Sequence, residues 1–240
     1  MRGELSSGRH SKRHPYDWYV DDYWVGSQLA QQLGWFEYER ETGLAVWDPS
    51  CGFGNTLQSI HGTVPIWLSD IVNHVKWALY PENYAPRPTY FDADFLECEV
   101  APAPCSIVCN PPYSYKKGIL EAFVRHALKL ATGRVCMVVP NKWLASQSRF
   151  RLFAIDHPPA EILHLTQRPS MPPGDRIALM GNRAFNGGMI DYCWIVWDAQ
   201  HPTAPGETRT LWLPPLLAGV ELPAPVSLTD ATPASALEEM

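Results

Sequence analysis

The sequence predicts a doubly wound α/β fold built on one mostly parallel sheet. Short apolar runs typical of buried strands alternate with segments whose apolar residues recur at helical spacing. A glycine-containing turn directly follows the first of these strands, as in α/β folds that bind nucleotides. With 240 residues, 46% of them hydrophobic, the chain can bury one full core, so a single domain is expected.

The elements follow one another along the chain. A helix is predicted over 22–33, with inward positions at Trp24, Leu29, Ala30 and Leu33. Strands are predicted near 44–47, 64–69, 106–109 and 134–139, with helices at 55–61, 73–79 and 118–131. In the last of these helices the apolar positions are Ile119, Ala122, Phe123, Ala127 and Leu130. A further helix is predicted over 144–155, and strands at 161–165 and 192–197 are expected to complete the sheet.

The first motif, Asp48-Pro49-Ser50-Cys51-Gly52-Phe53-Gly54-Asn55, follows the apolar run 44–47. Its two glycines allow a tight turn and the close approach of a ligand to the backbone. Asn55 is a candidate N-cap for the helix that follows. The turn has neither the G-x-G-x-x-G nor the Gly-Lys-Ser/Thr pattern, so it suits the phosphates of NAD or ATP poorly. Asp48 would repel a phosphate but attract an ammonium group, which favours a ligand with an amino-acid end.

The second motif, Asn110-Pro111-Pro112-Tyr113, ends the predicted strand 106–109. The Asn110 side chain offers a carbonyl acceptor for an N–H donor. The two prolines fix the backbone and leave carbonyl groups free to accept. The Tyr113 ring gives a face on which a nucleobase can stack. The motif therefore indicates a platform for a flat group that carries an amine.

Taken together, the two motifs resemble those of S-adenosylmethionine-dependent amino-methyltransferases that act on adenine N6, or less often cytosine N4, of DNA. The resemblance covers residues 16–198, and the cofactor motif comes first, as in the gamma-type arrangement. The closest likeness is to compact phage-type or prophage-type adenine methyltransferases. The second motif alone is shared with methyltransferases of RNA bases and of protein glutamine amides.

The resemblance implies a class I methyltransferase sheet that is mostly parallel and ends in an antiparallel hairpin, with S-adenosylmethionine as cofactor. Besides Asp48, Pro49, Cys51, Gly52, Gly54 and Asn55, the expected cofactor contacts are Tyr19, Asp21, Asp70, Ile71, Asp94 and Phe95. Asp70 ends the strand near 64–69, where an acidic residue accepts hydrogen bonds from ribose hydroxyls. For the adenine contact Asp92 is an alternative to Asp94. The pair Asp21-Asp22 stands where the gamma-type family has Thr-Pro, which departs from its pattern.

The resemblance also implies that Asn110, Pro111, Pro112 and Tyr113 are catalytic. The expected substrate contacts are Lys116, Lys117, Lys142 and Arg168. The formal net charge of −6 argues against strong non-specific binding to a DNA duplex, although not against a basic cleft. The acidic net charge is also compatible with a substrate other than nucleic acid.

The domain organisation is predicted in three parts. Residues 1–15 form a basic, flexible arm, 16–198 the catalytic domain, and 199–240 a proline-rich and partly disordered C-terminal segment whose end, 231–240, is acidic. Residues 166–190 form a long loop that is expected to face the substrate. We expect no large target-recognition domain besides this loop and the short C-terminal segment, which predicts a short or relaxed recognition sequence, or a partner chain for specificity. A homo-oligomer is the alternative to a complex with such a partner chain.

The six cysteines show no C-x-x-C spacing and no paired histidines, so they are expected to be buried thiols in a reducing, cytoplasmic setting, without a metal. No apolar stretch reaches the ~20 residues of a membrane span, and the N-terminus lacks the pattern of a signal peptide. The predicted function is transfer of a methyl group from S-adenosylmethionine to adenine N6 in DNA. The alternatives are an RNA-base or glutamine-amide methyltransferase, or an idle partner subunit.

Overall fold

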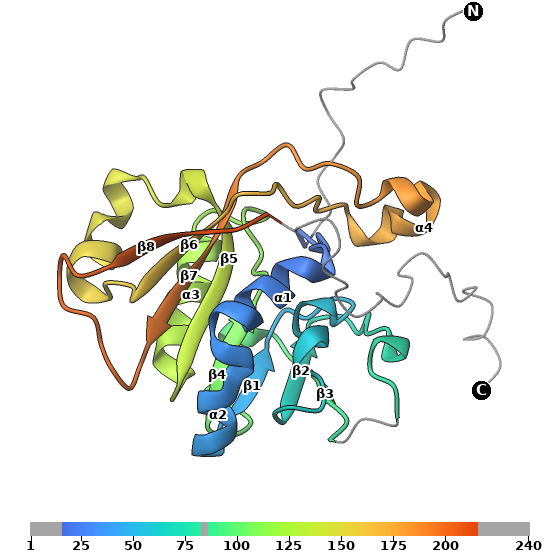
Figure 1. Ribbon diagram of the computed structural model, residues 1–240, viewed down its shortest axis with the longest axis horizontal. Helices are drawn as coiled ribbons and strands as arrows, with labels where there is room; N and C mark the ends of the chain where they lie inside the picture. Colours follow the sequence, from blue (N-terminus) through green and yellow to red (C-terminus); the bar gives the residue numbers. More distant parts are fainter. Residues whose placement is uncertain (1–15, 83–85, 216–240) are drawn as a thin grey trace, which may run out of the picture.

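The computed structural model of the chain describes residues 16–82 and 86–215. Its centre is an eight-stranded sheet in the order β3-β2-β1-β4-β5-β7-β6-β8 (Figure 1). The strands are β1 (Ala45–Asp48), β2 (Ile66–Asp70), β3 (Thr89–Asp92), β4 (Cys105–Cys109), β5 (Arg134–Pro140), β6 (Glu161–Leu165), β7 (Tyr192–Asp198) and β8 (Arg209–Leu213). The predicted arm 1–15 and the tail 231–240 lie outside the described residues.

The pairing of the strands confirms the predicted fold class. Strands β3, β2, β1, β4 and β5 run parallel, whereas β7 runs antiparallel to both β5 and β6. From β1 the chain builds the sheet outward to β2 and β3, and then returns to place β4 and β5 on the other side. This reversal leaves a crevice at the carboxyl ends of β1 and β4.

The two faces of the sheet bury separate apolar clusters, because side chains alternate along each strand. On one face Val46 and Val108 pack with α1 (Tyr23–Gln32). On the other face Trp47 and Ile107 pack with α3 (Ile119–Leu130). Helices thus cover both faces, as a doubly wound sheet requires.

Helices α1 and α3 confirm two of the predicted helices. Of the inward positions proposed for α3, Ile119, Phe123 and Ala127 are buried, whereas Ala122 is exposed. In α1 even Gly26 is buried, and a Cβ on it would lie 2.0 Å from the carbonyl oxygen of Thr56. The glycine lets α1 lie directly against the segment that follows the first motif.

Three other helix predictions were wrong in form. Residues 55–60 form a 3-10 helix. The Asn55 side chain does not cap this helix but donates to the Asp21 carbonyl oxygen (2.6 Å). Of the helix predicted over 73–79 only the 3-10 turn Trp77–Leu79 exists. The Lys76 N–H donates to the Phe53 carbonyl oxygen and not to a carbonyl of a preceding helical turn. The helix predicted over 144–155 is broken into the 3-10 helices Asn141–Trp143 and Gln147–Arg149 and the π-helix Leu152–Asp156.

Among the elements that were not predicted are α2 (Glu37–Thr42), β3 and β8. Strand β8 pairs in parallel with β6, and the Thr166 hydroxyl donates to the Leu213 carbonyl oxygen (2.6 Å). The expectation that the strands at 161–165 and 192–197 complete the sheet was therefore wrong. Part of the segment after residue 198 belongs to the sheet.

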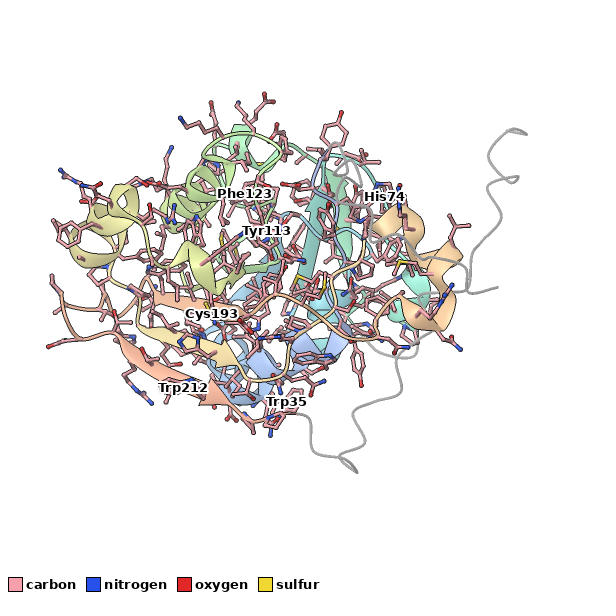
Figure 2. The ribbon with its side chains drawn as sticks, turned by 90° about the horizontal axis from the view of Figure 1, so that it is seen from above. Trp35, His74, Tyr113, Phe123, Cys193 and Trp212 are labelled. Atoms are coloured by element: carbon pink, nitrogen blue, oxygen red, sulfur yellow. The ribbon has the colours of Figure 1, made fainter. Side chains whose placement is uncertain are left out.

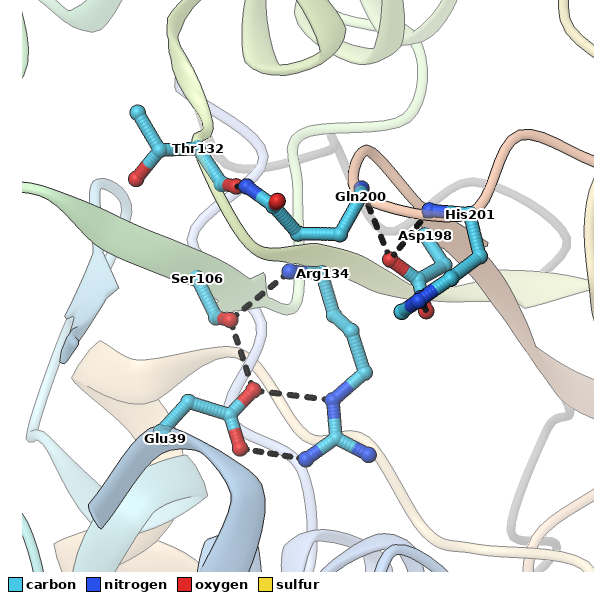
Figure 3. Close-up of polar contacts among 7 residues, drawn as sticks. All are labelled: Glu39, Ser106, Thr132, Arg134, Asp198, Gln200 and His201. Atoms are coloured by element: carbon cyan, nitrogen blue, oxygen red, sulfur yellow. Dashed lines mark hydrogen bonds and ion pairs between the residues drawn. The ribbon is translucent and has the colours of Figure 1, made fainter. Parts of the chain in front are cut away.

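A buried ionic network fixes α2 at the amino ends of β4 and β5, opposite to the crevice at the carboxyl ends of the strands (Figure 3). Glu39 is fully buried and forms an ion pair with Arg134, whose Nε lies 2.8 Å from its Oε1. The Ser106 hydroxyl donates to the same carboxylate (2.7 Å) and accepts from the Arg134 N–H (2.7 Å). These contacts join α2 to the starts of β4 and β5.

The six cysteines are all free thiols, and all but Cys98 are buried. None of the helices in the described part of the chain has the length and apolar character needed to span a membrane.

Candidate active site

The two predicted motifs meet at the carboxyl edge of the sheet. Strands β1 and β4 lie side by side, so the turns that follow Asp48 and Cys109 are neighbours. The Ser50 hydroxyl donates a hydrogen bond to the Asn110 carbonyl oxygen (3.1 Å), which joins the two turns. Open α/β sheets bind their ligands at this position.

The first turn is held by Asp70 at the end of β2. Gly52 and Gly54 have φ angles of 50° and 85°, in the left-handed region that favours glycine. The Gly52 N–H donates to Asp70 Oδ2 (2.9 Å), and the Ile71 N–H donates to its Oδ1 (2.8 Å). Burial raises the pKa of Asp70, although these N–H donors oppose the shift.

The side-chain amide of Asn110 is fixed from three sides. Its Nδ2 donates to the Tyr19 carbonyl oxygen (3.1 Å) and lies 3.4 Å from Asp21 Oδ1. Its Oδ1 accepts a hydrogen bond from the Tyr113 hydroxyl. The amide therefore has a defined orientation, with the nitrogen toward the segment 16–21 and the oxygen toward Tyr113.

Two buried carboxylates lie behind this platform. Asp21 accepts from the Thr56 hydroxyl (3.1 Å to Oδ1), and burial raises its pKa to about 6. Asp48 accepts from the Ser50 N–H (3.1 Å), but its Oδ2 is buried without a hydrogen-bond partner among the described residues. Burial, with the neighbouring Asp21 and Asp70, raises the pKa of Asp48 well above its usual range.

A first cavity of about 790 Å³, including its open mouth, lies above the two motifs. It is lined by many predicted site residues: Tyr19, Asp21, Pro49, Cys51, Gly52, Asn55, Asp70, Ile71, Asp94, Phe95, Asn110 and Pro112. Asp17, Asp21, Asp70 and Asp94 all line it, whereas no described Lys or Arg does. The cavity is therefore negatively charged and suits a cationic ligand.

A second cavity, of about 1120 Å³ with its open mouth, adjoins the first. Four aromatic residues line it: Tyr19, Tyr113, Trp143 and Tyr192. Lys142 and Arg149 are the basic residues on its wall, and the Arg149 guanidinium lies 5.0 Å from the centre of the Trp143 ring. Tyr113 is partly buried, and Figure 2 labels it between Phe123 and Cys193.

The loop 166–190 borders the second cavity through Met171 and Ile190. It contains the short helix α4 (Ile177–Met180) and is anchored on the segment before α1. The Val20 N–H donates to the Pro172 carbonyl oxygen (3.0 Å), and the Gly174 N–H donates to the Trp18 carbonyl oxygen (3.1 Å). The loop therefore touches the same segment that holds Asn110.

Several predicted site residues lie away from the first cavity. Asp48, Gly54 and Pro111 do not line it, and Tyr113 lines only the second. Of the predicted substrate contacts, Lys142 alone lines a cavity described here. Lys116 and Lys117 are exposed outside both cavities, and the Arg168 Nε pairs with Asp191 Oδ1 at 2.6 Å. For the adenine contact, Asp94 lines the cavity and Asp92 does not.

Several wall residues were not among the predicted site residues: Asp17, Trp18, His74, Phe123, Trp143, Arg149 and Tyr192. The Trp18 ring stacks on His74 with centroids 3.7 Å apart and closes one side of the first cavity. The aromatic segment 16–24 was a visible signal for Asp17 and Trp18. Trp143 and Tyr192 had no such signal, because the sheet brings them to Tyr113 from distant positions.

The sequence matches no family model, and no curated protein matches it. Solved structures do match its fold. A class I S-adenosylmethionine-dependent methyltransferase of unproven activity from Listeria monocytogenes gives a TM-score of 0.57 at 13% identity, over 85% of this chain and 68% of that one. This chain has the class I S-adenosylmethionine-dependent methyltransferase fold.

Two further structures share this fold with the chain. The methyltransferase subunit of a type I restriction-modification system from Streptococcus thermophilus gives a TM-score of 0.53 at 15% identity, covering 75% of this chain and 44% of that one. A protein from Pyrococcus horikoshii that is described as an RNA methyltransferase gives a TM-score of 0.52 at 14% identity, covering 73% of this chain and 82% of that one. The chain thus spans less than half the length of the Streptococcus subunit.

Proposed function

We propose that this protein transfers a methyl group from S-adenosylmethionine to the N6 amine of adenine in DNA, with a short or relaxed recognition sequence. The observation that carries the proposal is the position of Asn110, which lines one cavity and accepts a hydrogen bond from Tyr113 on the wall of a second cavity of different character. One cavity is acidic, and the other is aromatic with two basic residues on its wall. The methyl donor would occupy the first and the target base the second.

The first cavity fits S-adenosylmethionine better than a nucleoside phosphate. This cofactor carries one net positive charge, and the wall offers aspartates without a described Lys or Arg to bind phosphate. Asp21 would face its amino-acid end, Asp70 its ribose, and Asp94 with Phe95 its adenine. When bound, the cofactor supplies an electrophilic methyl group on a sulfonium. Asp48 lines neither cavity and burial raises its pKa, so it would support the wall through its hydrogen bond with the Ser50 N–H rather than through its charge.

Asn110 would hold the amine that receives the methyl group. Its amide nitrogen is committed to the Tyr19 carbonyl, so Oδ1 is the end available to accept. Oδ1 has two lone pairs, and the Tyr113 hydroxyl uses one of them. A substrate N–H can use the other, with the Pro111 carbonyl as second acceptor. These acceptors favour the positive charge that develops on the nitrogen during the reaction.

The second cavity would hold the base. The Tyr113 and Tyr192 rings, 6.1 Å apart, offer faces on which a flipped-out base can stack. Lys142 and Arg149 on the wall suit an adjacent phosphate. Lys116 and Lys117 would meet the phosphate backbone outside the cavity, and Arg168 would do so only by leaving its ion pair with Asp191.

The net charge of −6 favours a second candidate, a protein glutamine amide, whose N–H₂ group also suits the Asn110 platform. Salt dependence separates the two, because binding to nucleic acid weakens steeply as the salt concentration rises. RNA as substrate, and an idle subunit that works with a specificity partner, are further alternatives. The cytoplasmic setting stays a prediction.

The test uses tritiated S-adenosylmethionine with plasmid DNA, cellular RNA and cell-extract protein in parallel, followed by nucleoside and amino-acid analysis. We expect label in DNA as N6-methyladenine. Label only in RNA or in protein would refute DNA as substrate. An absence of label in all three, with cofactor binding measured separately, would refute the activity and favour the idle subunit.

A further inference from the structure

Asp17 has an unusual backbone and an unusual environment. Its φ angle is 52°, and among the described residues only Trp35 and Phe36 share a positive φ without being glycine. Its side chain is buried, with 7% exposure. Non-glycine residues held in this left-handed region cluster at functional sites, which makes Asp17 a candidate for one.

The Asp17 carboxylate is only half satisfied. Its Oδ2 accepts a hydrogen bond from the backbone N–H of Ser114, the residue after Tyr113. Its Oδ1 is buried and has no hydrogen-bond partner among the described residues. No described cation forms an ion pair with it. A buried carboxylate oxygen without a donor is unfavourable in the protein alone, so a ligand that donates to it would restore the balance.

Asp17 lies where the two cavities meet. It and Tyr19 are the only described residues that line both. The Tyr19 carbonyl oxygen accepts from Asn110 Nδ2, and the carboxylate itself is anchored beside Tyr113. Asp17 therefore belongs to the wall that the two cavities share, between the proposed places of the methyl donor and the acceptor.

We propose, on the basis of the function proposed above, that Asp17 Oδ1, in place of the Pro111 carbonyl, which lines neither cavity, accepts the second N–H of the substrate amine and takes its proton as the methyl group arrives. The nitrogen lone pair forms the new bond to carbon, and the carbon–sulfur bond breaks with its electron pair left on sulfur. The nitrogen then carries a positive charge, and its proton passes to Oδ1. The resulting carboxylic acid returns the proton to water after the product leaves.

The other carboxylates of the site are less suited to this role. The oxygens of Asp70 accept from Gly52 and Ile71, and Asp94 accepts from Leu96. Asp21 accepts from Thr56. Asp48 has an unpartnered oxygen but lines neither cavity. Asp17 combines the unpartnered oxygen with the position between the cavities.

Two variants test the role. Asp17→Asn keeps the shape and an oxygen for the Ser114 N–H but removes the charge, and Asp17→Gly removes the side chain while suiting the positive φ. Single-turnover methylation of DNA at saturating S-adenosylmethionine should fall by about 100-fold or more in both variants. The dissociation constant of S-adenosylmethionine, measured by calorimetry without DNA, should stay within about threefold of wild type. The control Glu99→Gln, at an exposed carboxylate outside both cavities, should change neither quantity.

Two results would overturn the proposal. One is a single-turnover rate in Asp17→Asn close to that of wild type. The other is a large loss of S-adenosylmethionine affinity with an unchanged rate at saturation, which would assign Asp17 to the ammonium group of the cofactor. If wild type itself labels no DNA, the proposed function fails, whereas label in wild type and variant alike refutes the role of Asp17 alone.

Discussion

The Tyr113 hydroxyl donates to Oδ1 of Asn110, three residues earlier in the same motif, and it also lies 3.1 Å from the Val138 carbonyl oxygen. The motif thus orients its own amide before any substrate arrives. The contact also fixes the Tyr113 ring on the wall of the second cavity. Ring and hydroxyl therefore have separable roles.

Tyr113→Phe keeps the ring and removes the hydroxyl, so DNA affinity should stay within about threefold while the methylation rate falls by roughly tenfold. Tyr113→Ala removes the stacking face and should weaken binding by ~1–3 kcal/mol per stacked base. Fluorescence anisotropy with a short labelled DNA measures the affinity. Equal loss of affinity in both variants would contradict a stacking role.

The buried pair of Glu39 and Arg134 should matter more for stability than the exposed pair of Glu37 and Arg40. Glu39→Ala leaves the Arg134 charge without its partner, which costs about 3–5 kcal/mol of unfolding free energy. Glu37→Ala should change it by less than about 1 kcal/mol. Urea unfolding of both variants provides the comparison, and equal effects would argue against the network as an anchor of α2.

Gly26→Ala should destabilise the protein although alanine favours helices. The new Cβ would lie 2.0 Å from the Thr56 carbonyl oxygen, so α1 must move away from the segment 55–60. Overpacking of this kind costs about 1–3 kcal/mol, more than the ~1 kcal/mol gained in helix propensity. Gln31→Ala, on the exposed side of the same helix, is the control and should be neutral. A thermal unfolding midpoint of Gly26→Ala above that of wild type would refute the close approach of α1 to the Thr56 carbonyl oxygen.

The raised pKa of Asp21, about 6 against 3.8 for a free side chain, predicts a pH dependence of stability. Between these values the folded state holds a proton that the unfolded state has lost, so unfolding free energy falls as pH rises from about 4 to about 6. Asp21→Asn removes this titration. The stability of the variant relative to wild type should therefore rise by up to about 3 kcal/mol between pH 4 and pH 7. Urea unfolding at both pH values measures the difference in unfolding free energy between Asp21→Asn and wild type, with Asp92→Asn as the exposed control. The same difference at both pH values would contradict the raised pKa of Asp21.

The central strands could be predicted because they are buried on both faces and read as continuous apolar runs, as β1 and β4 do. The edge strands β3 and β8 could not be predicted, since most of their side chains are exposed or half-buried and their apolar runs, Tyr90-Phe91 and Leu211-Trp212-Leu213, are short. The helix predicted over 73–79 failed for a tertiary reason. The Lys76 N–H bonds to Phe53 in the first motif, a contact that no local pattern encodes.

The core of the site could be predicted for a geometric reason. Motifs that follow neighbouring parallel strands meet at one edge of the sheet, which brings Asp70 and Asn110 to one cavity. The second cavity could not be predicted in the same way. Tyr192 begins the antiparallel strand β7, and Trp143 follows β5, so only the assembled sheet brings them to Tyr113.

The central claim is that Asn110, on the wall of the first cavity beside Tyr113, acts on the substrate amine, and the variant Asn110→Ala tests it most directly. Methylation of plasmid DNA and the affinity for S-adenosylmethionine are measured on the same preparation, with wild type alongside. We predict that turnover is abolished while the dissociation constant of S-adenosylmethionine changes by less than about threefold. A variant that still methylates DNA at a rate near that of wild type would contradict the claim.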